Sequence, residues 1–145
     1  MSTDYTDLKT ITSVRGKHDE LTERIIGVFY DVYNELGYGF LESVYREAMQ
    51  VALGQVGLEV KVEIPVPVYF RGSVVGVFRA DLMVNDSVLV ELKSCEQLLK
   101  QHDSQTMHYL RATFLEVALL MNFGPTARFK RLVMNNDLKK SHEKL

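Results

Sequence analysis

The chain has 145 residues, of which 46% are hydrophobic and 25% are charged, so it is long enough to bury the core of one globular domain. Its formal net charge of −2 excludes a strong overall attraction to nucleic acid and leaves any such contact to a local basic patch or a bound metal ion. The lone cysteine, Cys95, excludes an internal disulfide, and no apolar run is long enough to cross a bilayer. We therefore expect a cytoplasmic protein that does not insert into a membrane.

The first part of the chain predicts two helices behind a polar arm. Residues 1–17 are polar and weakly patterned, and we expect them to form a flexible N-terminal arm. Residues 18–36 carry apolar side chains at helical spacing, and Gly37 provides a natural stop. A second helix is expected over residues 40–53, with Leu41, Val44, Ala48, Val51 and Ala52 as its apolar side.

Three strands are expected next, in an antiparallel meander. Residues 58–70, 74–84 and 88–93 alternate between polar and apolar side chains and are separated by short turns. Pro65 and Pro67 cannot donate hydrogen bonds to a strand ladder. The proline-containing half of the first strand is therefore expected at an edge of the sheet or outside regular pairing.

The remaining residues predict one helix and two more strands. The helix covers about residues 102–113, a continuous apolar run at 115–123 indicates a buried strand, and a final strand follows at 127–134. Residues 135–145 read as a polar tail that is frayed or forms a short helix. The order α-α-β-β-β-α-β-β predicts an α/β or α+β sheet with helices packed on it, in one domain over residues 18–134.

Two neighbouring strands carry charged side chains that could form a site. Asp81 stands among apolar residues near the middle of a strand, where aspartate is disfavoured. Glu91 and Lys93 share one face of the next strand, and pairing of the two strands would bring Asp81 to Glu91. Two carboxylates beside one ammonium group can hold a divalent metal ion against a phosphate. Alternatively, Asp81 pairs with Arg79 or caps a bulge near a strand end.

A second Glu-x-Lys triplet shows that the triplet alone is not specific. Glu59 and Lys61 lie on the first strand, without an aspartate on a preceding strand, and the alternation continues to Glu63 as a solvated face would. The presence of Asp81 is what distinguishes the triplet that ends at Lys93.

Two helical pairs are further candidates, each with a plain structural explanation. Glu42 and Tyr45 are three residues apart on the second helix, where an acid in the first turn is also favoured by the helix dipole. Gln105 and Tyr109 are four residues apart on the later helix, with His102 one turn earlier. That stripe could equally be a polar helix face with an amphipathic tyrosine.

Taken in order, these segments resemble a known family. The pattern Gly-x-x-Glu-x-x-Tyr is followed by the aspartate, by the Glu-x-Lys strand and by the His, Gln and Tyr of the later helix, at Gly39, Glu42, Tyr45, Asp81, Glu91, Lys93, His102, Gln105 and Tyr109. This combination looks like the bacterial GxxExxY proteins of the PD-(D/E)XK nuclease superfamily, over about residues 21–133. The resemblance implies a restriction-endonuclease-like α-β-β-β-α-β core with an extra N-terminal helix.

The resemblance also implies an activity. It points to a nuclease that depends on Mg²⁺ or Mn²⁺ and hydrolyses phosphodiester bonds of nucleic acid, with DNA expected rather than RNA. The metal ligands would be Asp81, Glu91 and the main-chain carbonyl of Leu92, and the catalytic residues would be Lys93, Glu42, Gln105 and Tyr109. The alternative is a non-catalytic module on the same fold that binds nucleic acid or protein. A homo-oligomer is compatible with either function.

Overall fold

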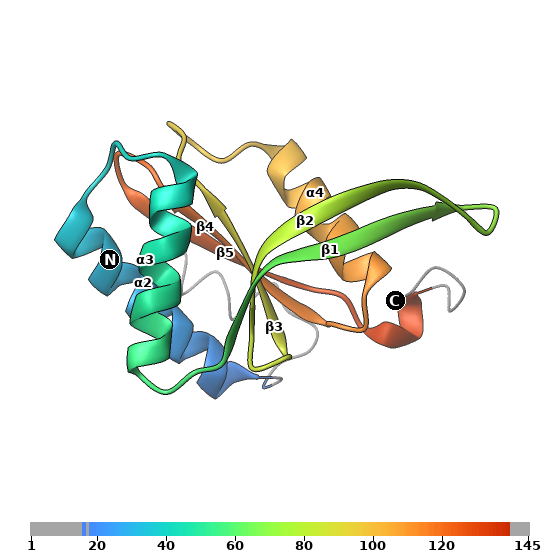
Figure 1. Ribbon diagram of the computed structural model, residues 1–145, viewed down its shortest axis with the longest axis horizontal. Helices are drawn as coiled ribbons and strands as arrows, with labels where there is room; N and C mark the ends of the chain where they lie inside the picture. The colour runs from blue at the N-terminus through green and yellow to red at the C-terminus, as the bar shows by residue number, and fades with distance from the viewer. Residues whose placement is uncertain (1–15, 17, 140–145) are drawn as a thin grey trace.

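The computed structural model describes residue 16 and residues 18–139, and its elements follow the predicted order (Figure 1). They are α2 (Asp19–Leu36), α3 (Glu42–Gln55), β1 (Val60–Phe70), β2 (Ser73–Val84), β3 (Val88–Lys93), α4 (Lys100–Ala112), β4 (Val117–Phe123), β5 (Ala127–Val133) and the short 3₁₀ helix η1 (Asn136–Leu138). The expected N-terminal arm lies outside the described residues except for Gly16, and so does the end of the polar tail, residues 140–145. Within the described part of the chain, no helix is long and apolar enough to span a membrane.

The sheet has five strands in the order β1-β2-β3-β4-β5. The first three form the predicted antiparallel meander, and β1 is the edge strand that Pro65 and Pro67 indicated. Strands β3 and β4 are parallel, which requires a crossover, and α4 provides it. The expected mixed α/β sheet is thus confirmed, with β4 buried along its whole length.

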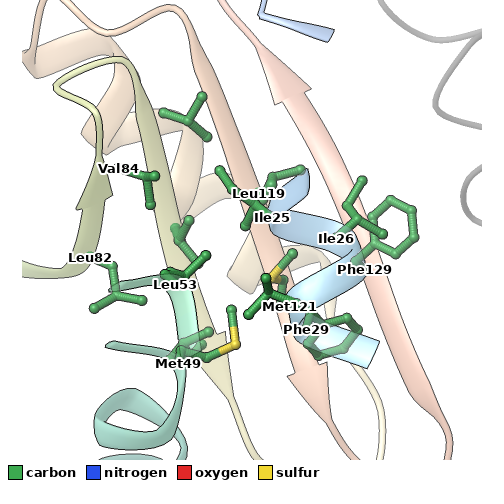
Figure 2. Packing of buried hydrophobic residues seen from close by; sticks show 14 of the residues in the cluster. Ile25, Ile26, Phe29, Met49, Leu53, Leu82, Val84, Leu119, Met121 and Phe129 are labelled. Atoms are coloured by element: carbon green, nitrogen blue, oxygen red, sulfur yellow. The ribbon is translucent and has the colours of Figure 1, made fainter. Parts of the chain in front are cut away.

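Helices cover both faces of the sheet. Figure 2 shows the larger apolar cluster, in which Phe29 of α2 and Met49 of α3 pack with residues of β2, β4 and β5. A smaller cluster on the other side joins Tyr109 and Leu110 of α4 to Leu89 of β3. The site residues on β3 therefore lie between two helical layers, with α3 on one side and α4 on the other.

The buried side of α3 agrees with the prediction only in part, since Ala48 and Ala52 pack against the core but Val44 is exposed. Tyr45, Met49 and Leu53 are its buried residues, whereas Leu41 is 76% exposed and Val51 is 58% exposed. The difference arises because Tyr45 takes the inward position and stacks on the ring of a β4 residue, Phe123, at 4.0 Å between centroids. The aromatic ring therefore sets the rotation of the helix.

Strand β1 changes the face that it packs on, close to Asp81. Val62 packs against the cluster under α2 and α3, but Ile64, two residues later, packs against the cluster under α4. The change occurs at Glu63, whose φ of 50° lies in a region that L-residues seldom occupy. Glu63 stands between Val62 and Ile64, which pair with Leu82 and Ala80, the residues on either side of Asp81. This bend therefore lies beside the candidate site.

Beyond the bend, β1 and β2 continue as a two-stranded ribbon. The ladder between β2 and β3 covers only residues 82–84, so the rest of β2 pairs with β1 alone. Residues 64–80, called the arm below, extend past α4 and away from the body of the molecule (Figure 1).

Candidate functional site

Asp81 lies where β2 separates from β3, and it forms hydrogen bonds with both Glu91 and Leu92. Its backbone N–H donates to Oε1 of Glu91 at 2.8 Å, and its Oδ2 accepts from the backbone N–H of Leu92 at 2.8 Å. Where the β2–β3 ladder ends, side-chain carboxylate oxygens therefore accept these two hydrogen bonds in place of main-chain carbonyls. The predicted approach of the two carboxylates is present, and each holds the other strand in position.

Arg46 of α3 is the cation that pairs with Asp81. Its Nη1 lies 3.4 Å from Oδ1 of Asp81, and its Nη2 lies 3.9 Å from Oε2 of Glu63. The ion pair considered from the sequence, with Arg79, is therefore not the one that forms. Arg46 was missed by the sequence reasoning, and the only signal for it was its position four residues after Glu42 on the same helix.

Glu91 is a buried carboxyl group with only 3% of its surface exposed. Its pKa is raised to about 8, chiefly by burial and then by the charges of Asp81 and, more weakly, Glu42, against the N–H of Asp81 and the ammonium of Lys93. The side chains of Glu42 and Lys93 therefore both lie within electrostatic reach of Glu91. Of the predicted residues, the structure brings Asp81 and Glu91 into contact, whereas Glu42 and Lys93 act on Glu91 through their charges.

Tyr109 reaches the same site from α4. Burial raises its pKa to about 12, and the charges of Glu91 and Asp81 act in the same direction. Its phenol group is therefore protonated at neutral pH and available as a hydrogen-bond donor.

The other polar residues of α4 are arranged differently. Gln105 is half-buried one turn before Tyr109, and its side chain makes no hydrogen bond to any other residue that the structure describes. His102 accepts a hydrogen bond at Nδ1 from the backbone N–H of Leu99, at 2.9 Å. His102 therefore caps the start of α4.

The loop before α3 is tied to the end of β3. The hydroxyl group of Tyr45 donates to the carbonyl of Gly37 and accepts from the N–H of Phe40 at 3.2 Å. The carbonyl of Phe40 in turn accepts from Oγ of Ser94, the residue after Lys93, at 2.8 Å. Gly39 has a φ of 122°, which favours glycine. These contacts give a physical reason for the Gly-x-x-Glu-x-x-Tyr spacing, because they place the first turn of α3 beside the site.

The oxygen atoms at the site suit a hard divalent cation. The carboxylates of Asp81 and Glu91 and the main-chain carbonyl of Leu92 are donors of the kind that Mg²⁺ and Mn²⁺ prefer. Within the described residues, no three His, Cys, Asp or Glu side chains gather as a metal site, so the third protein ligand would have to be that carbonyl. A bound cation would favour the ionised form of the buried Glu91 carboxyl group beside Asp81.

The class of protein follows from comparison with known families. A family model described as the PD-(D/E)XK nuclease superfamily matches residues 19–132, which is most of the described chain. The protein therefore belongs to the PD-(D/E)XK nuclease superfamily. Nucleases of this superfamily act on nucleic acid and generally use divalent metal ions.

Individual relatives are distant. Among curated proteins, no sequence matches the chain significantly. A solved structure, "Crystal structure of SSO0001", is similar with 20% sequence identity and a TM-score of 0.48, over 64% of this chain and 50% of that chain. The match thus spans half the length of that protein.

Proposed function

We propose that the protein is a nuclease of the GxxExxY group that hydrolyses phosphodiester bonds, preferring DNA to RNA, with Mg²⁺ or Mn²⁺ as cofactor. The observation that carries this proposal is the reciprocal pair of hydrogen bonds that holds Asp81 and Glu91 together at the end of the β2–β3 ladder. Asp81, Glu91 and the carbonyl of Leu92 would hold the ion. Once bound, it would lower the pKa of a coordinated water and stabilise negative charge on the phosphate oxygens.

The neighbouring side chains have complementary roles in this proposal. Lys93, whose charge acts on Glu91, orients the attacking water and accepts its proton when it is a neutral amine, or balances charge on the phosphate when it is an ammonium group. Tyr109 donates a hydrogen bond to a phosphate oxygen, and Gln105, one turn away, helps to position the phosphate. Glu42, an exposed residue in the first turn of α3, would reach the ion directly or through a water molecule.

Cleavage by matched lysine variants tests the proposal. Wild-type protein with Mn²⁺ is expected to cut single- or double-stranded DNA, and Lys93→Ala to cut it about 10²- to 10⁴-fold more slowly. Lys61→Ala is the control, because Lys61 also ends a Glu-x-Lys triplet on a strand but is paired with Asp86 at 2.7 Å on the surface. Equal rates for wild type and Lys93→Ala would exclude the nuclease function.

A binding module without catalysis is the second candidate, and the contact of Arg46 with Asp81 favours it. An acid already neutralised by a protein cation at 3.4 Å resembles a structural ion pair. In that case the protein would bind an oligonucleotide or a protein, and no cleavage would appear with either metal ion.

Tyr45→Phe is expected to lower cleavage without changing metal affinity, and it therefore tests whether the loop before α3 positions the site. The variant keeps the stacked ring but loses both hydrogen bonds of the hydroxyl group, which costs about 1–2 kcal/mol in the free energy of unfolding. Cleavage should fall because the first turn of α3 is no longer held beside Lys93, while Mn²⁺ affinity measured by calorimetry stays unchanged.

Tyr33→Phe provides the comparison for this variant. The hydroxyl group of Tyr33 donates to the carbonyls of Gly124 at 2.7 Å and Pro125 at 2.9 Å, in a loop that does not precede α3. Urea unfolding should show a similar loss of stability, with cleavage retained. If both variants cleave DNA equally well, the loop before α3 has no positioning role.

A further inference from the structure

The arm, residues 64–80, is an unusual surface for a chain with a net negative charge. Its exposed side chains are largely apolar, including Phe70 at 57%, Val75 at 63% and Phe78 at 38% exposure. The base of the arm packs on α4 through Val66 and Ala80, but exposed apolar surface of this kind indicates a binding surface. The arm is therefore expected to bind a partner.

The charge of the arm indicates what that partner is. Residues 64–80 contain two arginines, Arg71 and Arg79, and neither an aspartate nor a glutamate. Arg111 adds a third cation from the last turn of α4, and neither Arg79 nor Arg111 has an ion-pair partner in the described part of the chain. A second copy of the arm would bring like charges together, whereas a polyanion would complement them.

A groove between the arm and α4 supplies a place for one base. It has a volume of about 180 Å³, and its lining includes Tyr69 and Phe78 of the arm together with His108 and Arg111 of α4. Aromatic walls next to cations are the features with which proteins stack the bases of single strands. A base that is paired and stacked in a duplex could not enter such a groove.

The groove is connected to the candidate site by one ring contact. Phe78 packs edge-on against Tyr109, with 5.5 Å between ring centroids and 75° between planes. Tyr109 in turn packs in one cluster with Ala80, the residue before Asp81, and with Leu89, two residues before Glu91 on β3. A base in the groove would therefore belong to a nucleotide near the phosphate at the metal site.

We propose that this groove binds one unstacked base of a single-stranded nucleic acid, so that the substrate contains unpaired nucleotides at the cleavage site. The inference rests on the nuclease function proposed above, but the groove can be tested by binding alone. Arg79 and Arg111 would contact the flanking phosphates.

Anisotropy of a labelled single-stranded DNA oligonucleotide, measured with the full chain at fixed salt and without metal, tests the groove. We expect single-stranded DNA to bind at least about tenfold more tightly than the same sequence in a duplex. Phe78→Leu, which fills the space without a π face, should lower the single-strand affinity about tenfold, and Phe78→Tyr should retain it. Val75→Leu is the matched control, because Val75 is exposed on the arm but does not line the groove.

The possible outcomes separate this inference from the proposed function. Equal affinity for single strand and duplex, or equal effects of Phe78→Leu and Val75→Leu, would overturn the groove proposal even if the protein cleaves DNA. Single-strand binding that depends on Phe78, in a protein that cleaves nothing with Mn²⁺, would support the groove and exclude the nuclease. Self-association that Phe78→Leu abolishes, without any binding of the oligonucleotide, would assign the arm to a second copy of the chain and also overturn it.

Discussion

Asp81→Asn is expected to lower Mn²⁺ affinity by at least about 100-fold, or about 2.7 kcal/mol, and to abolish metal-dependent cleavage. The asparagine carbonyl can still accept the hydrogen bond that the N–H of Leu92 now donates at 2.8 Å, so the local geometry is kept. The substitution removes the negative charge beside Glu91, and Arg46 keeps its 3.9 Å ion pair with Glu63. Titration calorimetry with Mn²⁺ and urea unfolding without metal should show lost binding and a stability that is unchanged or higher.

Asp86→Asn is the matched control for this variant. It also removes one carboxylate from the same region of the chain, but Asp86 is in the exposed turn between β2 and β3 and pairs with Lys61. Its Mn²⁺ binding should equal that of the wild type, with a change in stability of no more than about 1 kcal/mol. Retention of Mn²⁺ binding by Asp81→Asn, at the level of this control, would remove Asp81 from the metal site.

The pH dependence of metal binding has the second large expected effect. Because the pKa of Glu91 is raised to about 8, the metal-free protein holds a proton on that carboxyl group at neutral pH. A cation that binds the carboxylate must displace this proton. Mn²⁺ affinity should therefore rise by about tenfold per pH unit from about pH 6 to about pH 8 and level off above that, and calorimetry in buffers of different ionisation enthalpy should detect about one released proton at about pH 6.5.

The stability of the metal-free protein should change in the opposite direction. The folded-state pKa of Glu91 lies above the unfolded value of about 4.3, so its contribution is complete below about pH 4 and is lost as the pH rises toward the folded value of about 8. The slope contributed by this one group is at most about 1.4 kcal/mol per pH unit.

Two glutamine substitutions test whether Glu91 causes the pH dependence of both metal binding and stability. Glu91→Gln should remove both the proton release and this component of the stability profile, because the amide does not titrate. Glu59→Gln, at the exposed residue just before β1, should keep the wild-type profile in both measurements. If Glu91→Gln and wild type show the same pH dependence of unfolding, the burial of Glu91 does not control titration of the protein.

Local patterns in the sequence predicted the elements well. Helical and alternating periodicities depend on neighbours within a few residues, so the order of elements, the edge position of β1 and the buried strand β4 could all be read from them. The same local reading misjudged α3, since Val44 and Tyr45 are adjacent and only the ring of Phe123 selects which of them faces inward.

The candidate site, like the fold, could be predicted from the sequence only in part. The sequence by itself determined that two carboxylates and a lysine lie on neighbouring strands, because strand periodicity and register are short-range properties. Only the tertiary structure decided what surrounds them: Arg46 reaches Asp81 across 35 residues of chain, and the arm forms because Glu63 turns β1 onto the other face of the sheet. Contacts between distant segments depend on how helices and strands pack together, and no spacing within one element encodes that geometry.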